Sequence, residues 1–165
     1  MNIRAIYPGT FDPITNGHLD LIVRGNLLFH TLIVAVAENP LKTPSFGIEE
    51  RLSMIREAVH ECPDVEVVSF NSLLVDCVHT HNAQVIIRGL RAVSDFEYEL
   101  QMALVNRKQD EHIETVFMMP DENHIYLSSS IVKELAQFGG NIDTMVPPGV
   151  AERLKRLYQK DKGKP

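Results

Sequence analysis

The segment of this sequence with the clearest potential for chemistry is the glycine- and proline-rich stretch from Pro8 to His18. It lies between an apolar run and a helical pattern, so its glycine N–H groups could approach an anion at the positive end of a helix. Gly9 and Gly17 are eight residues apart and no lysine follows, which disfavours a dinucleotide fingerprint and a P-loop. A helix N-terminus favours a neutral imidazole at His18 unless a phosphate is bound there. We interpret His18 as a phosphate ligand; a surface or capping histidine is the alternative.

Two arginines flank a glycine turn further along the chain, at Arg88-Gly89-Leu90-Arg91. Two guanidinium groups beside a glycine make a good fork for phosphate oxygens, because each presents planar pairs of N–H donors. We therefore favour phosphate binding for both arginines. The alternative is an ion pair with an acidic side chain on the next helical stretch: Asp95, Glu97 or Glu99.

A lysine and a run of serines complete the candidate anion donors. Lys42 lies in a loop that two prolines stiffen, although a lone loop lysine is usually solvated. Ser128, Ser129 and Ser130 precede a helical stretch. Helix capping accounts for one of these serines, and the others could donate to an anion at the positive helix end.

Apolar runs of strand length alternate with segments of helical periodicity, and the candidate groups lie in the connections between them. The predicted strands cover Ile3–Tyr7, Leu32–Ala37, Val65–Phe70, Val85–Ile87 and Thr115–Met119. The predicted helices cover Gly17–Phe29, Ile48–His60, Leu73–His81, Asp95–Asp110, Ser129–Phe138 and about 150–160. We expect Ser72 to cap the third helix, and Ser94 with Glu97 to form a capping box at the fourth.

This order of elements predicts an α/β fold, a doubly wound, Rossmann-like sheet of five parallel strands with helices on both faces. We expect a single domain over residues 1–165, which ends in a basic helix and tail at about 150–165. Sheets of this kind bind ligands beyond the carboxyl ends of their strands, near the point where strand order reverses. The loops after the first, second, fourth and fifth strands are therefore the predicted site.

Composition and charge disfavour several classes of protein. The chain has 44% hydrophobic and 23% charged residues, as globular proteins do, and its net charge of −6 disfavours a nucleic-acid binder. Cys62 and Cys77 form no C-x-x-C pair, so we expect no disulfide framework and no cysteine-based zinc site, and a reduced, cytoplasmic setting. The longest strongly apolar run, Leu32 to Ala37, is too short for a membrane span, and we expect no signal segment.

The segment Thr15-Asn16-Gly17-His18 resembles the T/H-x-G-H signature of the nucleotidyltransferase superfamily and lies, as expected, between the first strand and the first helix. Further segments in the same order resemble the bacterial phosphopantetheine adenylyltransferases: Tyr7–Pro13, Ile87–Arg91, Asp95–Glu99 and Ser128–Ser130. The resemblance extends over nearly the whole chain. It implies that AMP is transferred from ATP to 4′-phosphopantetheine, with release of pyrophosphate and 3′-dephospho-coenzyme A.

Two rival functions are weighed against this one. The first is another adenylyltransferase or cytidylyltransferase of the same superfamily, for example one that acts on nicotinamide mononucleotide. The block from Arg88 to Glu99 disfavours that rival. The second is a nucleotide-binding module without turnover, in which His18, Lys42 and Arg91 would be an unexplained excess of phosphate-directed groups in an acidic chain.

The resemblance also implies roles for individual residues. His18, Lys42 and Arg91 stabilise the transition state, and no general base is needed because the attacking phosphate is already an anion. The implied phosphopantetheine-binding residues are Thr10, Lys42, Leu74, Arg88, Met102 and Asn106. The implied ATP-binding residues are Thr10, Phe11, His18, Gly89, Leu90, Arg91, Glu99, His124, Ile125, Tyr126, Leu127, Ser128, Ser129 and Ser130.

The sequence departs from the family pattern at His124, where an aromatic residue is common, and at Gly47, a predicted helix cap where Thr or Ser is frequent. Leu73 also resembles the lining of the pantetheine arm, with core packing as its alternative. Asp12 is interpreted as a turn former beside Pro13.

The expected cofactor is Mg²⁺, held by ATP phosphates and water, because the sequence has no metal-ligand spacing. The family is typically a hexamer that coenzyme A inhibits by feedback, and the resemblance implies both properties here. The helical stretch at 95–110 also predicts a homo-oligomer, because it is apolar on more than one side. Its main stripe is expected to pack on the sheet and comprises Phe96, Leu100, Ala103 and Leu104; lying off that stripe are Tyr98, Met102 and Val105.

Overall fold

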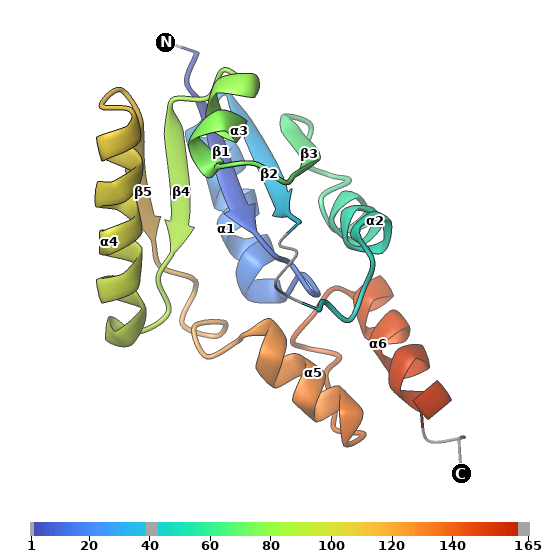
Figure 1. Ribbon diagram of the computed structural model, residues 1–165. Helices are drawn as coiled ribbons and strands as arrows, with labels where there is room; N and C mark the ends of the chain where they lie inside the picture. Colours follow the sequence, from blue (N-terminus) through green and yellow to red (C-terminus); the bar gives the residue numbers. More distant parts are fainter. Residues whose placement is uncertain (1, 39–42, 162–165) are drawn as a thin grey trace.

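Strands and helices alternate along the described chain in the order predicted from the sequence (Figure 1). The structure is a computed structural model and describes residues 2–38 and 43–161. The strands are β1 (Arg4–Gly9), β2 (Thr31–Ala37), β3 (Val65–Phe70), β4 (Val85–Gly89) and β5 (Glu114–Met118). The helices are α1 (Asn16–Leu28), α2 (Ile48–Ala58), α3 (Leu74–Thr80), α4 (Val93–Gln109), α5 (Ser129–Gln137) and α6 (Pro148–Asp161). No helix in the described ranges is long and apolar enough to cross a membrane.

The strands form a parallel sheet in the order β3-β2-β1-β4-β5. Strand order reverses between β1 and β4, which are neighbours in the sheet but not along the chain. The strand arrowheads in Figure 1 point toward the end of the molecule where α5 and α6 lie. The α/β, doubly wound, Rossmann-like sheet is therefore confirmed, and its reversal point lies at the loops that carry the candidate residues.

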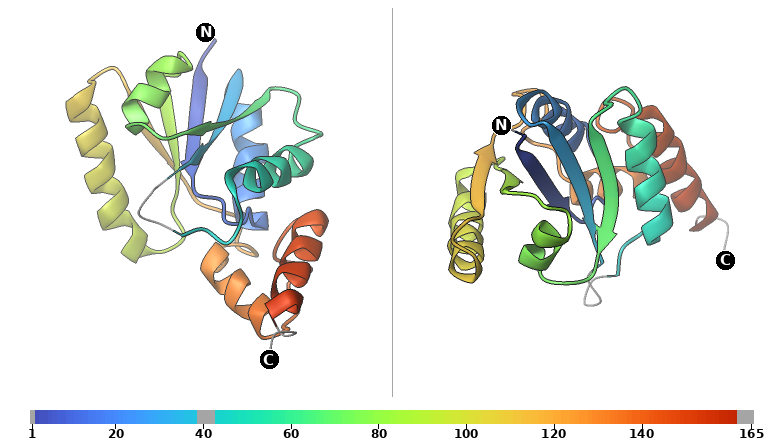
Figure 2. Two further views of the ribbon diagram at one scale, coloured as in Figure 1. Left: turned by 45° about the vertical axis from the view of Figure 1, so that its right-hand side comes forward. Right: turned by 90° about the horizontal axis from the view of Figure 1, so that it is seen from above.

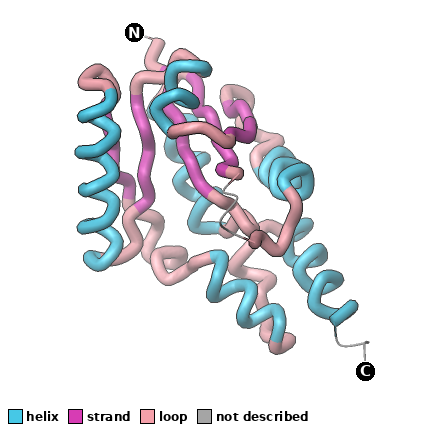
Figure 3. The backbone as a smooth tube through the Cα atoms, in the orientation of Figure 1, coloured by secondary structure: helices cyan, strands magenta, loops and turns pink. Residues whose placement is uncertain are grey.

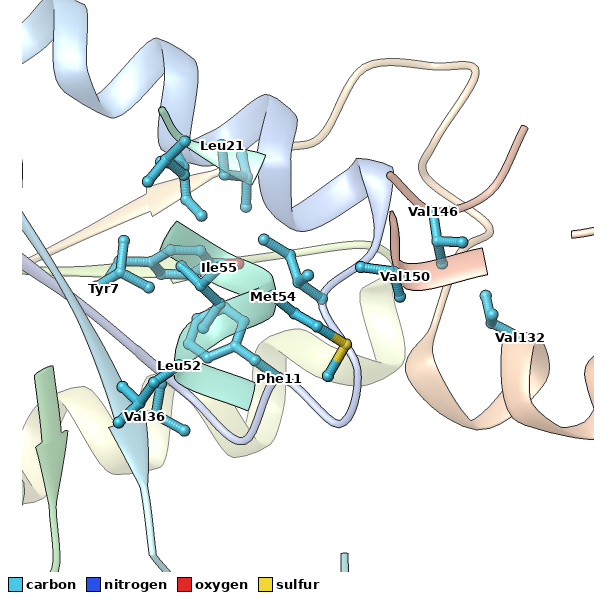
Figure 4. Close-up of a cluster of buried hydrophobic side chains, with 14 of the residues drawn as sticks. Tyr7, Phe11, Leu21, Val36, Leu52, Met54, Ile55, Val132, Val146 and Val150 are labelled. Atoms are coloured by element: carbon cyan, nitrogen blue, oxygen red, sulfur yellow. The ribbon is translucent and has the colours of Figure 1, made fainter. Parts of the chain in front are cut away.

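Helices cover both faces of the sheet, as predicted, and the view from above separates them (Figure 2). On one face, α1 and α2 pack on β1 and β2 in the larger apolar cluster. On the other face, α3 contributes Val78 to a smaller cluster. The larger cluster continues past the strand ends, where Val132 of α5 and Val150 of α6 join Phe11 of the loop after β1 (Figure 4). The core thus extends directly beneath the predicted site.

Helix α4 covers less of the sheet than predicted. Phe96 stacks edge-to-face on Phe117 of β5, with 6.0 Å between ring centroids, yet its side chain is 44% exposed. Leu100 and Leu104 are 39% and 60% exposed. The expectation that this stripe packs on the sheet is therefore largely wrong. The physical reason is position, because α4 lies beside β5, an edge strand of the sheet, and only part of its surface meets another element (Figure 2).

Two predicted helix caps are also wrong. Leu73 is the N-cap of α3, and the Ser72 hydroxyl instead donates to the Leu73 carbonyl. Ala92 is the N-cap of α4, so position 94 lies inside the helix and not at the predicted cap position. In both cases the chain enters the helix from extended backbone and no side chain caps it. Tertiary context overrides the local capping preference at these two helix starts.

Candidate active site

A cavity of about 810 Å³ opens at the carboxyl ends of the strands, where Figure 3 shows loops gathered between the sheet and α5. It lies between the loop after β1, the β4–α4 connection and the start of α5. The described residues predicted for the site that line this cavity are Thr10, Phe11, His18, Leu74, Arg88, Gly89, Arg91, Met102, Asn106, Ser128, Ser129 and Ser130. The fold therefore collects residues from widely separated parts of the chain in one cleft.

The N-terminal cap of α1 determines how His18 presents its imidazole. Thr15 is the N-cap: its hydroxyl accepts the His18 N–H at 3.3 Å, and the Nδ1 of His18 accepts the Thr15 N–H at 3.0 Å. An Nδ1 that accepts a hydrogen bond has no proton, so the neutral ring carries its proton on Nε2. Burial, followed by the charge of Arg91, lowers the pKa of His18 to about 4. His18 is thus a capping residue and also a neutral N–H donor at the cavity.

Asp12 anchors the loop after β1, a larger role than the turn former predicted for it. Its carboxylate is 5% exposed and accepts the N–H groups of Ser45 and Phe46, both at 2.9 Å. It also accepts a 2.7 Å hydrogen bond from the ammonium group of Lys133 on α5. One buried carboxylate therefore ties the loop after β1 to the segment that leads into α2 and to α5.

The two arginines at the carboxyl end of β4, Arg88 within the strand and Arg91 just beyond it, line the cavity and are also ion-paired to α4. Arg88 holds Glu99 in a bidentate pair, through Nε at 2.5 Å and Nη2 at 2.6 Å. Burial alone would lower the pKa of Arg88, but the hydrogen bonds and charge of Glu99 outweigh burial and raise it. Arg91 pairs with Asp95 at 3.3 Å and donates to the Leu127 carbonyl at 3.2 Å. Each arginine therefore forms an ion pair with an acidic side chain of α4, as the alternative to phosphate binding predicted.

The end of the cavity away from the serines is suited to a long, partly apolar ligand. Leu74 at the start of α3 and Met102 on α4 line it, and a flexible thioether adapts to such a ligand. Asn106 also lines the cavity and is only 8% exposed, so its amide is a buried polar group beside these apolar side chains. Leu73 is 66% exposed and does not contribute to this lining.

The three serines at the start of α5 have three different positions. Ser128 is the N-cap and accepts the Ile131 N–H at 3.2 Å, so capping accounts for one serine, as predicted. The Ser129 hydroxyl donates to the Pro13 carbonyl at 2.7 Å, which joins α5 to the loop after β1. The Ser130 side chain is exposed at the cavity. The N-terminus of α5 therefore faces the cleft with a hydroxyl available to an anion.

His124 and Leu127 line a second, smaller cavity of about 60 Å³ that shares His18 and Arg91 with the larger one. The Nδ1 of His124 is buried and has no hydrogen-bond partner among the described residues. Buried polar atoms without a partner are rare in folded proteins. The predicted contact between His124 and the nucleotide would give this Nδ1 atom a polar partner.

Some predicted residues lie elsewhere. Ile125 and Tyr126 are 38% and 56% exposed and line neither cavity, and the same holds for Leu90, whose N–H donates to the Met118 carbonyl. Glu99 lies behind the lining and acts on the cavity through Arg88. Lys42 falls outside the described residues, so its role stays a prediction.

Similarity to known proteins shows the family of this chain. The cytidylyltransferase-like family model matches residues 6–135. A curated phosphopantetheine adenylyltransferase of Methylococcus capsulatus is 57% identical over 158 residues, which cover 96% of this chain and 98% of that one. The chain belongs to the phosphopantetheine adenylyltransferase family. A second phosphopantetheine adenylyltransferase, from a Synechococcus species, is 56% identical over 94% of this chain and 96% of its own.

Solved structures with the same fold share much less sequence with this phosphopantetheine adenylyltransferase family member. A putative nicotinate-nucleotide adenylyltransferase from Vibrio parahaemolyticus matches with a TM-score of 0.71, 16% identity and 97% coverage of each chain. A lipopolysaccharide core biosynthesis protein from Thermoplasma volcanium matches with a TM-score of 0.54 and 22% identity, over 72% of this chain and 96% of that one. These two matches support the fold alone.

Two cations near the cavity of this phosphopantetheine adenylyltransferase family member were not predicted from the sequence. Lys133 lines the cavity, and its position one helical turn after Ser130 was the available signal. Arg51 is 4% exposed on α2. Its signal was a cation at a core-facing position, beside Leu52 and four residues before Ile55.

Proposed function

We propose that this chain transfers the adenylyl group of ATP to 4′-phosphopantetheine, giving 3′-dephospho-coenzyme A and pyrophosphate. The observation that carries the proposal is the hydrogen bond from the Thr15 N–H to the Nδ1 of His18. It leaves the Nε2 proton free to be donated at the positive end of α1, close to Arg91. A neutral donor at that point suits charge that develops on a phosphate oxygen during the reaction.

In this mechanism an oxygen of the phosphopantetheine phosphate attacks the α-phosphorus of ATP, and the bond to pyrophosphate breaks on the opposite side. The nucleophile is already an anion and pyrophosphate leaves without a proton, so the protein supplies no general base. Its task is to bring two polyanions together and stabilise charge at the α-phosphoryl group. We assign that stabilisation to His18, Lys42 and Arg91, and the positioning of the attacking phosphate to Thr10.

The two substrates would occupy different parts of the cleft. The phosphopantetheine phosphate would lie near Arg88 and Lys42, with its arm along Leu74, Met102 and Asn106. ATP would lie between the loop after β1 and the serine segment of α5. The Arg88–Glu99 pair then implies that phosphate and Glu99 compete for or share one guanidinium group.

We infer that Mg²⁺ enters with ATP. Within the described chain, no group of three His, Cys, Asp or Glu side chains could hold a metal ion. Asp12, the buried carboxylate at the cavity, already accepts hydrogen bonds from three donors. This donor set fits an ion that is held by phosphate oxygens and water, where Mg²⁺ would offset negative charge on the triphosphate.

We also propose that the chain assembles into a homo-oligomer, a hexamer by family resemblance, in a cytoplasmic setting where coenzyme A inhibits by feedback. The exposed apolar side chains of α4, Phe96, Tyr98 and Leu104, support assembly because a second copy could cover them. The free thiols of Cys62 and Cys77 suit a reducing compartment. Coenzyme A shares the phosphopantetheine arm, so it would compete for the apolar end of the cleft.

The decisive test is pyrophosphate release from ATP with 4′-phosphopantetheine as acceptor, compared with nicotinamide mononucleotide. We expect pyrophosphate release from ATP when 4′-phosphopantetheine is the acceptor, and none when nicotinamide mononucleotide is the acceptor. His18→Ala should abolish most of it, whereas the matched control His60→Ala, on an exposed histidine, should not change it. Preference for nicotinamide mononucleotide would assign the chain to the rival transferase. ATP binding without pyrophosphate release from either acceptor would assign it to the class of non-catalytic nucleotide-binding modules.

A further inference from the structure

Arg51 on α2 is a buried cation that bridges the ends of two adjacent strands. Its side chain is 4% exposed, and its Nη1 donates to the carbonyl of Thr10 at 2.8 Å and to that of Ala37 at 3.2 Å. None of the ion pairs recorded among the described residues includes Arg51, and its Nε is buried without a partner. An arginine side chain keeps its positive charge even when it is buried. Burying a cation without a carboxylate partner is costly, which points to a functional reason for this placement.

The carbonyl that Arg51 holds belongs to the same peptide unit as the N–H of Phe11. In a trans peptide the C=O and N–H groups lie in one plane and point in opposite directions, and the only cis bond recorded in the described chain is Asp12–Pro13. The Thr10 carbonyl points to Arg51, so the Phe11 N–H points away from α2. Thr10 and Phe11 both line the cavity, and no backbone hydrogen bond recorded among the described residues is donated by the Phe11 N–H.

The Phe11 backbone needs support to keep this direction. Its φ is 47°, in the left-handed region that residues other than glycine seldom adopt. The ring is 2% exposed and packs edge-on against the rings of Tyr7 and His18, with centroids 5.4 and 5.1 Å away. Figure 4 shows it in the same cluster as Leu52, the residue that follows Arg51 on α2. The ring anchors one end of this short segment, and Arg51 anchors the peptide bond just before it.

We propose that Arg51 is a positioning residue: by holding the Thr10 carbonyl it aims the Phe11 N–H into the cavity as a donor to a phosphate group of the bound nucleotide. Arg51 does not line the cavity itself, so it acts through the peptide and not by contact with the ligand. Its buried charge also makes that N–H a stronger donor, because a cation at the carbonyl end polarises the peptide unit. The inference rests on the proposed function for the identity of the nucleotide, ATP.

The test replaces Arg51 by Met, which keeps most of the length, and by Lys, which keeps the charge and an N–H donor. The matched control is Arg56→Met, on the exposed side of the same helix. Two readouts are needed: the Kd of α,β-methylene ATP, which cannot react, and the steady-state kcat and KM with 4′-phosphopantetheine. Melting temperatures show that each variant is folded at the assay temperature.

We expect Arg51→Met to weaken analogue binding and lower kcat by about ten- to a hundredfold, the worth of a charge-assisted hydrogen bond. The KM for 4′-phosphopantetheine should be unchanged, Arg51→Lys should recover part of the loss, and Arg56→Met should match the wild type. Wild-type kcat and Kd in Arg51→Met, with or without a lower melting temperature, would overturn the proposal. An equal rise of the Kd for α,β-methylene ATP and of the KM for 4′-phosphopantetheine would also overturn it, because such a rise indicates that the whole cleft has loosened.

If Arg51→Met fails to fold, Arg51→Lys carries the test: weaker analogue binding at an unchanged KM for 4′-phosphopantetheine supports the proposal, and an equal rise of the analogue Kd and of that KM overturns it. Failure of the proposed function has a different signature. In that case the wild-type chain binds α,β-methylene ATP but releases no pyrophosphate with 4′-phosphopantetheine. The binding comparison would still decide the role of Arg51, because it requires no turnover.

Discussion

The loop after β1 and the segment at the carboxyl end of β4 both carry groups expected to meet phosphate, but they hold these groups in opposite ways. In the loop after β1 the donors are a neutral imidazole and backbone N–H groups, which Thr15, Asp12 and Arg51 hold in place from behind. At the carboxyl end of β4 the donors are the guanidinium groups of Arg88 and Arg91, and each is paired with a carboxylate of α4. The first region is organised before a ligand arrives, whereas the second must change partners.

This difference predicts a division of labour. A donor that is already in place and neutral loses little when the ligand binds, so it can act mainly on the charge that develops in the transition state. A guanidinium group that exchanges a carboxylate for a phosphate gains only the difference between two ion pairs, which appears as affinity. We therefore expect changes in the loop after β1 to act mainly on kcat, and changes at Arg88 and Arg91 to raise KM as well, even though Arg91 also stabilises the transition state in the proposed mechanism.

His18→Ala should have the largest effect. Removing one such donor costs about 2.7–4 kcal/mol, or roughly 10²–10³-fold in kcat. The KM for ATP should change little, because the hydrogen bond strengthens only as charge develops. Steady-state kinetics with both substrates measure the division. A variant with near-normal kcat and poor ATP affinity would make His18 a ground-state ligand and would remove the proposed difference between the two regions.

His18→Gln is the matched control for that loss. Glutamine at this helical position can accept the Thr15 N–H through its carbonyl oxygen, as in a capping box, and still present an N–H donor. We expect it to recover part of the activity lost in His18→Ala, and to recover more than the shorter asparagine does. Equal activity of the Gln and Ala variants would show that a hydrogen-bond donor at this position is not what matters.

Arg91→Ala should have an intermediate effect, a loss of about ten- to a hundredfold in kcat/KM for ATP, since charged hydrogen bonds contribute about 1.5–3 kcal/mol. The melting temperature should change little, because Arg91 is 43% exposed and its pair with Asp95 is a surface pair. Asp95→Ala is the complementary variant, and it should leave ATP affinity equal or higher by freeing Arg91. A lower melting temperature with normal ATP kinetics in Arg91→Ala would make the arginine structural.

The smallest effect concerns stability in acid. Because the pKa of His18 is lowered to about 4 from 6.5, the unfolded chain binds a proton between these values that the folded chain does not. The free energy of unfolding should therefore fall as pH decreases from 6.5 to 4, by an amount of the order of 1 kcal/mol after solvent screening. Urea unfolding at several pH values measures it. The His18→Gln variant should lack this pH-dependent part of the free energy of unfolding. Parallel curves of unfolding free energy against pH for the wild type and His18→Gln would contradict the prediction.

The sequence alone determined the order of the elements and most of the cavity lining. Strand-length apolar runs and helical periodicity are local patterns, so β3 and the alternation of strands and helices follow from them. Because parallel strands end at one edge, their loops had to meet there, which predicted that His18, Arg88 and Ser130 would share a cleft. The single domain and the role of Lys42 stay predictions.

Only the tertiary structure decided what holds those groups. Arg51 and Thr10 are far apart in the sequence, as are Asp12 and Lys133, and no local pattern pairs them. The same holds for the exposure of α4, which depends on its place at the edge of the sheet. Periodicity reports which side of an element is buried but not what it is buried against. The direction of the Phe11 N–H therefore depends on a side chain forty residues away, whose partner appears only when the chain is folded.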